Sequence, residues 1–235
     1  MREAANGERT PILILNGALL TQDGEGLAET IGWVAIEEGR IAATGAGAAP
    51  SVWRTRAGRT IDARHMAVLP GLINGHTHLS QTFMRGLADG RPLLRWLKEI
   101  IWPLQSAMTP EDMRLAALLG LVENLRCGAT AVVQHHKLPG RDHIEATLQA
   151  AEQVGIRMTL ARGWVDLGPN GEPLDHILAD LRRLHDVRRS AGAFRPSRIR
   201  IASGPLAAWR CSDAAMREIT ALARDQGMGT HIHVS

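Results

Sequence analysis

Two histidines separated by a single residue, His76 and His78, have the residue type and spacing best suited to chemistry in this sequence. They follow an apolar run, Met66 to Ile73, that reads as a linker entering a short buried strand. Side chains two apart at a strand end point to the same side, so both imidazoles can ligate one metal ion. If the strand belongs to an α/β barrel, the pair lies at its catalytic end.

A second pair, His231 and His233, alternates in the same way near the end of the sequence. We expect a strand from Gly229 to Val234 with both histidines on one face. We also expect the sequence to be part of a longer chain, because it stops inside this strand at Ser235.

The pattern of elements predicts an α/β fold. Strand candidates occur at residues 72–75, 129–134, 158–162, 199–203 and 229–234. Helices lie between them: Thr109 can cap one that Gly128 closes, and others run from Asp142 to Gly155 and from Ser212 to Gly227. Strands separated by helices imply parallel pairing. We therefore predict a partial (β/α)8 barrel of about five strands.

The first part of the chain has a different pattern. Short strand-like pieces occur at residues 12–20, 32–37, 40–43 and 59–62, and Glu38-Gly39 supplies a hairpin turn. We predict a small β domain over residues 1–66 and the barrel over residues 67–235.

Composition restricts the class of protein. The chain has 235 residues, 45% hydrophobic and 22% charged, with a formal charge of +3, which is typical of a soluble globular protein. The basic isoelectric point, near 9.5, leaves a nucleic-acid-binding protein as an alternative. However, the densest arginine group has a helical pattern that favours a solvated helix face: Arg182, Arg183, Arg188 and Arg189. No apolar run approaches the ~18 residues of a membrane span. Cys127 and Cys211 are far apart, which fits a reducing cytoplasm.

Several motifs occur in a recognisable order. They are Leu-Pro-Gly-Leu-Ile-Asn-Gly-His-Thr-His (69–78), Gly-Ala-Thr-Ala-Val-Val-Gln-His-His (128–136), Leu-Ala-Arg-Gly-Trp (160–164) and His-Ile-His-Val-Ser (231–235). In this order the chain resembles the N-terminal half of the metal-dependent amidohydrolase superfamily, in the branch of chlorohydrolases and deaminases that act on triazines, purines and related rings. The resemblance implies a distorted (β/α)8 barrel and a β-sandwich built from both chain ends.

The resemblance also implies the site. One divalent metal, zinc first and iron as the alternative, would be held by His76, His78 and His233. A further histidine, an aspartate and the proton-shuttle glutamate are expected beyond Ser235, so no catalytic residue is assigned within the chain. His231 is expected to be a hydrogen-bonded histidine deeper in the barrel.

Three residues match substrate-binding positions of this branch: Gln81, His136 and Arg162. An amide such as that of Gln81 offers a donor and an acceptor to a ring edge. Each residue has a second interpretation: a solvated loop residue for Gln81 and for the pair His135-His136, and a salt bridge for Arg162. Trp96 is expected to anchor a loop helix, and its second interpretation is a part of the pocket lid.

Departures from the branch pattern bear on the substrate. Leu206 follows Gly204-Pro205 where adenosine-type relatives carry a histidine, and Leu94 and Arg95 stand where they carry glutamates. These differences favour a bare ring, such as a purine base, pterin or triazine, over a ribose-bearing substrate.

The predicted function is hydrolytic deamination of a nitrogen heterocycle. The alternatives are a truncated, inactive fragment of such an enzyme, and hydrolysis of a cyclic amide or carbon–halogen bond by the same metal site. We expect a small-molecule heterocyclic substrate and neither a nucleic acid nor a membrane as partner. Assembly into a homo-oligomer is left open.

Overall fold

The structure, a computed structural model, describes residues 10–22, 30–87, 90–190 and 198–234, with the backbone alone for residues 188–190. The chain divides into two compact units, Met1–Pro70 and Gly71–Ser235. The domain boundary between residues 66 and 67 stays a prediction.

The first unit contains one mixed sheet in the order β3-β2-β1-β4, with β5 also paired to β1. Its strands are β1 (Ile12–Leu19), β2 (Thr30–Glu37), β3 (Arg40–Ala46), β4 (Arg59–Asp62) and β5 (Ala67–Val68), and α1 (Ser51–Arg56) precedes β4. Glu38 and Gly39 both have positive φ, 49° and 76°, which confirms the predicted hairpin turn between β2 and β3. A small core forms around Leu13, Trp33 and Trp53.

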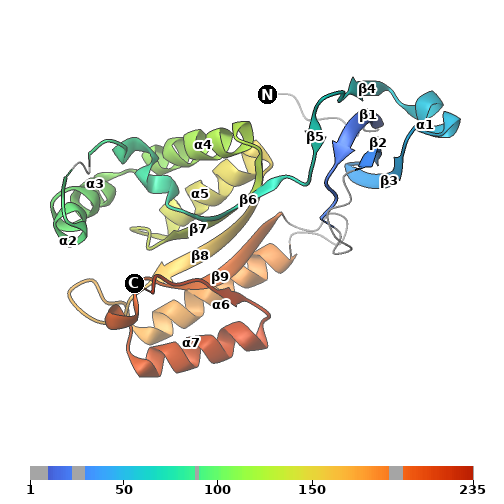
Figure 1. Ribbon diagram of the computed structural model, residues 1–235. Coiled ribbons are helices and arrows are strands. Elements are labelled where there is room, and N and C mark those ends of the chain that lie inside the picture. The colour runs from blue at the N-terminus through green and yellow to red at the C-terminus, as the bar shows by residue number, and fades with distance from the viewer. Residues whose placement is uncertain (1–9, 23–29, 88–89, 191–197, 235) are drawn as a thin grey trace. The chain divides into compact units, whose positions relative to one another are not determined.

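The second unit is built on a five-stranded parallel sheet in the order β10-β9-β8-β7-β6. The strands are β6 (Leu72–Thr77), β7 (Ala129–His136), β8 (Arg157–Trp164), β9 (Ile199–Pro205) and β10 (Gly229–Thr230). They form a curled half-barrel, which confirms the predicted α/β fold class with about five barrel strands (Figure 1).

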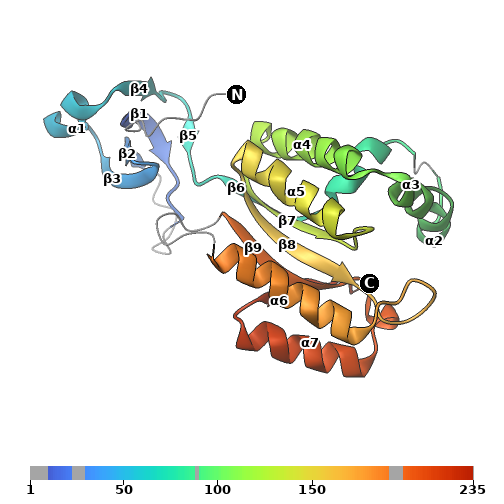
Figure 2. The ribbon, with the colours of Figure 1, turned by 180° about the vertical axis from the view of Figure 1, so that it is seen from behind.

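Four helices connect these strands: α4 (Pro110–Arg126), α5 (Arg141–Val154), α6 (Leu174–Ser190) and α7 (Asp213–Asp225). Figures 1 and 2 show the sheet from its two sides, with the connecting helices gathered on one face. A continuous core fills the space between sheet and helices and includes Leu160, Trp164, Ile177 and Ile219. The histidines of the candidate site lie at the carboxyl ends of the strands.

Local sequence signals set the helix ends. The Thr109 hydroxyl accepts from the Asp112 backbone N–H at 3.2 Å, and the Asp112 carboxylate accepts from the Thr109 N–H at 2.8 Å. This capping box satisfies two backbone donors that the first turn of α4 would leave free. Gly155 ends α5 in the left-handed conformation with φ 76°, a conformation that glycine adopts without steric cost.

A long connection after β6 carries part of the site. It contains the 3₁₀ turn η1 (Leu79–Met84) and a helical stretch made of α2 (Leu93–Trp96), η2 (Leu97–Ile101) and α3 (Trp102–Ala107). A loop helix had been expected around Trp96, but the bounds of these elements had not been predicted.

The last strand is shorter than predicted. β10 ends at Thr230, so the expected strand over residues 229–234 is wrong beyond this point. Within the described residues β10 pairs only with β9, over two residue pairs, and such short one-sided pairing leaves the following residues irregular. One further backbone bond, from the His231 N–H to the Ser203 carbonyl at 2.9 Å, holds the chain against β9.

The structure also bears on the densest arginine group and on the search for a membrane span. Arg182 and Arg183 lie on α6, where Arg183 forms ion pairs with Asp180 and Glu145, whereas the side chains of Arg188 and Arg189 lie outside the described residues. Among the residues described, no helix is long and apolar enough to cross a membrane.

Candidate metal centre

The candidate site lies at the carboxyl ends of the parallel strands. His76 is the second-to-last residue of β6, and His78 directly follows this strand. His135 and His136 are the last two residues of β7. His231 and His233 come directly after β10. Because neighbouring strands are parallel, these ends meet at one edge of the half-barrel, where barrel enzymes place their chemistry.

Three of these imidazoles converge on one point. The Nε2 atom of His76 lies 3.2 Å from that of His78 and 3.3 Å from that of His233. Nitrogens bound tetrahedrally to zinc at about 2.0–2.1 Å are about 3.3–3.4 Å apart. The distances from His76 to His78 and to His233 therefore fit a zinc coordination shell, and all three ligand atoms lie within 4.8 Å of one another.

Their protonation also fits a cation. His78 Nδ1 faces the His135 backbone carbonyl, and His233 Nδ1 faces the Leu206 carbonyl at 2.7 Å. A carbonyl oxygen only accepts, so both Nδ1 atoms carry the proton and both Nε2 atoms carry a lone pair. Two lone pairs aimed at the same place repel each other unless a cation lies between them.

His76 makes two kinds of contact in this cluster: a hydrogen bond through Nδ1 and longer approaches between Nε2 atoms. Its Nδ1 lies 2.8 Å from His231 Nε2, which is a hydrogen-bond distance and shorter than the 3.2–3.3 Å between the Nε2 atoms. When His76 donates through Nδ1 to His231, its Nε2 becomes the third lone pair. This arrangement matches the hydrogen-bonded role expected for His231. A metal-ligating histidine commonly donates its other ring nitrogen in this way.

Burial favours the neutral form of His76, His78 and His135. Burial lowers the pKa of His78 to about 4 and that of His135 to about 3. Burial lowers the pKa of His76 as well, and the nearby imidazoles of His233 and His231 add to the effect. Since a metal binds only the neutral imidazole, these groups are ready to ligate near pH 7 without losing a proton.

One residue of the pair His135-His136 was expected to face the substrate and His136 was assigned to that role, yet it is the ring of His135 that lies inside the cluster. It is fully buried, its ring centroid is 4.5 Å from that of His233, and its Nε2 donates to the Gly204 carbonyl at 3.2 Å. His76, His135 and His231 form a second group of three whose ligand atoms lie within 4.8 Å of one another. Alternation along β7 predicts that His135 and His136 face opposite ways, and the structure places His135 in the histidine cluster.

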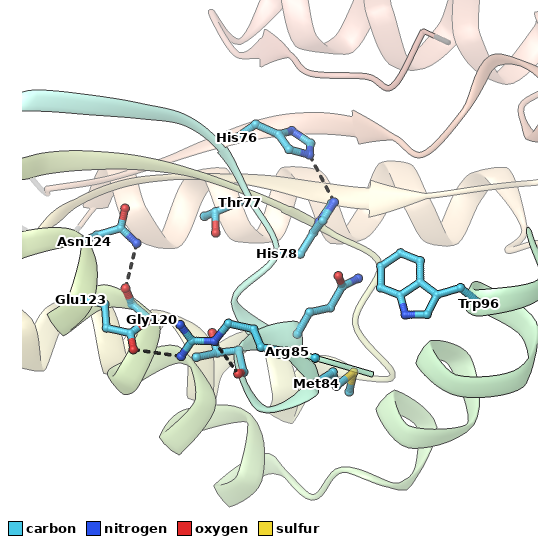
Figure 3. A pocket seen from close by; sticks show the side chains of 12 residues that line it. His76, Thr77, His78, Met84, Arg85, Trp96, Gly120, Glu123 and Asn124 are labelled. Atoms are coloured by element: carbon cyan, nitrogen blue, oxygen red, sulfur yellow. Dashed lines mark hydrogen bonds and ion pairs between the residues drawn. The ribbon is translucent and has the colours of Figure 1, made fainter. Parts of the chain in front are cut away.

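A cavity of about 400 Å³ opens beside the histidines. Figure 3 shows His76 and His78 along one side of it, with Trp96, Arg85 and Glu123 around the remainder. Gln81, predicted to contact a ring, lines this cavity. The volume is within the range of small-molecule pockets.

The other two predicted substrate contacts, His136 and Arg162, are not among the residues that line this cavity. His136 is half-buried beside His78, with ring centroids 5.2 Å apart, and its Nδ1 is 3.5 Å from the Ser80 hydroxyl. The Arg162 guanidinium contacts Glu172 at 2.6 Å and Asp180 at 3.0 Å. It therefore has the salt bridges that were its second interpretation, and its predicted role in substrate binding remains a prediction.

Residues 67–235 match the amidohydrolase family. The chain belongs to this family. It is 35% identical over 204 residues to a 5'-deoxyadenosine deaminase of Methanothermobacter thermautotrophicus, covering 87% of this chain and 45% of the relative. It is also 35% identical over 225 residues to a 5-methylthioadenosine/S-adenosylhomocysteine deaminase of Desulforudis audaxviator, covering 95% and 49%. The chain thus spans about half the length of these relatives.

Solved structures show the same likeness. A triazine hydrolase from Arthrobacter aurescens superposes with a TM-score of 0.83 at 27% identity, over 96% of this chain and 53% of that one. An adenosine deaminase from Xanthomonas campestris with bound zinc gives a TM-score of 0.79 at 28% identity, over 96% and 49%. This family relationship confirms the predicted resemblance to the N-terminal half of such proteins.

Proposed function

We propose that this chain forms the metal-binding half of a metal-dependent hydrolase that deaminates a nitrogen heterocycle. The observation that carries the proposal is the convergence of three Nε2 atoms, on His76, His78 and His233, beside a cavity. One divalent metal fits this donor set, and zinc is the first choice because neutral imidazoles suit it, with iron as the alternative. The Xanthomonas relative in the family was crystallised with zinc.

The metal, when bound, supplies a water nucleophile at neutral pH. The residues of the chain hold and aim the reactants. His78 and His233 keep their Nε2 atoms directed at one point by donating through Nδ1 to backbone carbonyls, and Gln81 offers its amide to a ring edge in the cavity. His136, next to His78, is proposed as a further substrate contact.

A proton must also reach the leaving amine, which in such chemistry is the work of a carboxylate. Among the described residues, neither three-histidine group includes a carboxylate. We propose that the proton shuttle and the remaining ligands belong to the part of the relatives' length that this chain does not span.

Two substrate classes have separate support. Leu206, Leu94 and Arg95 favour a bare ring such as a purine base, pterin or triazine, because histidine and acidic contacts to a ribose are replaced. The sequence relatives, a 5'-deoxyadenosine deaminase and a 5-methylthioadenosine/S-adenosylhomocysteine deaminase, instead favour adenosine derivatives. The likeness to an atrazine chlorohydrolase, with a TM-score of 0.81, supports carbon–halogen hydrolysis as a second candidate reaction.

The test begins with the coding sequence past Ser235. A chain extended to the length of the relatives is loaded with zinc and assayed for ammonia and chloride release on purine bases, pterins, triazines, chlorotriazines and adenosine derivatives. Ammonia release that disappears in the His78→Ala variant is the expected result. Full zinc occupancy with neither ammonia nor chloride released from any of these compounds contradicts the proposal.

A further inference from the structure

The segment that carries His76 and His78 is bulged. Asn74 on β6 is opposite Val132 on β7, but Thr77 is opposite Gln134, so three steps along β6 match two along β7. The extra residue takes this stretch out of the regular ladder and changes the direction of its side chains. The backbone N–H groups of the bulge then need other partners to stay in one conformation.

Asn74 supplies the partner at the start of the bulge. Its Oδ1 accepts from the His76 backbone N–H at 3.2 Å, and its Nδ2 donates to Asn124 Oδ1 at 2.8 Å. Asn124 in turn donates through Nδ2 to the Gly120 carbonyl at 2.7 Å. Two side-chain amides thus connect the backbone of helix α4 to the backbone of His76, and Figure 3 shows Asn124 directed toward Gly120 on this helix.

Gln134 supplies the partner at the other end. It is fully buried on β7, and its Oε1 accepts from the Leu79 backbone N–H at 2.8 Å. Leu79 directly follows His78 and begins the turn η1. The amides of Asn74 and Gln134 therefore hold the backbone on both sides of the two ligands.

We infer that Asn74 and Gln134 are positioning residues of the metal centre, which fix the bulge so that the imidazoles of His76 and His78 converge. The inference rests on the proposed metal-binding function. Neither amide belongs to the three-histidine groups. Their effect passes through the backbone of residues 76–79, in the way that groups around a metal site orient its ligands.

The test measures metal binding by the full 235-residue chain with cobalt(II) as the probe. Affinity comes from competition with a chromophoric chelator, and coordination geometry from the visible absorption band. We expect N74L and Q134L to lose about tenfold to hundredfold in cobalt affinity, as is typical when such outer groups are removed, and to shift the band. N74D keeps an acceptor for the His76 N–H but cannot donate to Asn124 Oδ1, so it is expected to recover only part of the affinity.

A matched control separates positioning from general stability. Gln105 is a buried amide of the same unit that donates to the Lys137 carbonyl at 2.9 Å. Q105L should lower the free energy of unfolding and leave cobalt affinity and the visible band unchanged. If N74L does not fold, N124A replaces it: alanine suits the helix α4, and loss of Asn124 releases Asn74, so cobalt affinity should fall.

The outcomes distinguish the inference from the function on which it rests. A wild-type chain that binds no cobalt overturns both. A wild-type chain that binds cobalt, with equal affinity and band in the folded Asn74 or Asn124 variant and in Q134L, overturns the inference alone. Loss of affinity in Q105L equal to that in N74L has the same consequence, because the effect would then follow stability.

Discussion

At the scale of single residues, each ring nitrogen of the three predicted ligands has one function. His78 and His233 use Nδ1 for a backbone carbonyl, and His76 uses Nδ1 for His231, at 2.8 Å. The three Nε2 atoms remain for the metal. Because the backbone and His231 fix the outer nitrogens, the inner ones cannot rotate away without breaking a hydrogen bond.

The first prediction concerns a ligand. His78→Ala should abolish stoichiometric zinc binding, since two imidazoles from this chain, on His76 and His233, would remain of the group of three. Metal analysis after dialysis against a low zinc concentration measures this. His143→Ala is the control, because His143 is bonded to the Met108 carbonyl at 2.9 Å and is outside both histidine groups. Full zinc content in His78→Ala would show that His78 is not a ligand.

The second prediction concerns the ring contact. Gln81→Ala should lower kcat/KM on the best substrate of the extended chain by the equivalent of about 1 to 3 kcal/mol, the usual cost of leaving a buried polar group unpaired. Zinc content should not change, because Gln81 lines the cavity but is not in a histidine group. Gln153→Ala, at an exposed position of α5, is the control. An unaltered kcat/KM in Gln81→Ala would indicate a solvated loop residue.

At the scale of elements, local chemistry explains which parts of the fold were predictable. The ends of α4 and α5 follow from Thr109, Asp112 and Gly155, whose effects act within one helical turn. The length of β10 depends on pairing with other strands, and for this reason the strand predicted to reach Val234 ends at Thr230. At the bulge in β6, the Asn74 side chain is bonded to Asn124, 50 residues away in the sequence, and no local pattern indicates this contact.

The third prediction concerns the contact between β8 and α6. Arg162→Met should lower the free energy of unfolding by roughly 3 kcal/mol, near the low end for removing one partner of a buried ion pair. The Arg162 side chain is 11% exposed, and its loss leaves Glu172 and Asp180 without this cation. Urea unfolding of the zinc-free chain measures the change.

Arg95→Met is the control for this experiment. Arg95 pairs with Glu99 at the surface, where the Arg95 side chain is 68% exposed, and such pairs contribute about 0.2 to 1 kcal/mol. If Arg162→Met unfolds at the same urea concentration as the wild type, the ion pairs of Arg162 do not stabilise the fold, and the predicted role of Arg162 in substrate binding is favoured.

At the scale of the whole molecule, the parallel order of the strands brings the site together. His76 and His233 are 157 residues apart, yet their Nε2 atoms are 3.3 Å apart. Strand–helix alternation predicted the parallel sheet, whereas the joining of His76, His78 and His233 was expected from the family resemblance. The orientation of each ring could not be predicted, because it is set by the His135, Leu206 and His231 contacts, which exist only in the folded structure.

The last prediction separates metal binding from catalysis in the 235-residue chain itself. Zinc should stabilise this chain, because a ligand that binds only the folded state contributes about 4 kcal/mol when its free concentration is 1,000 times Kd. Turnover should be absent, since a missing general acid or base costs about 10² to 10⁴-fold in rate, and the histidine groups of the described residues contain no carboxylate. Thermal unfolding with and without zinc, followed by ammonia assays on the same samples, tests both parts. Zinc-dependent stabilisation should disappear in His78→Ala. Ammonia release by the 235-residue chain near one turnover per second, dependent on His76 and His233, would mean that a carboxylate within residues 1–235 moves the proton.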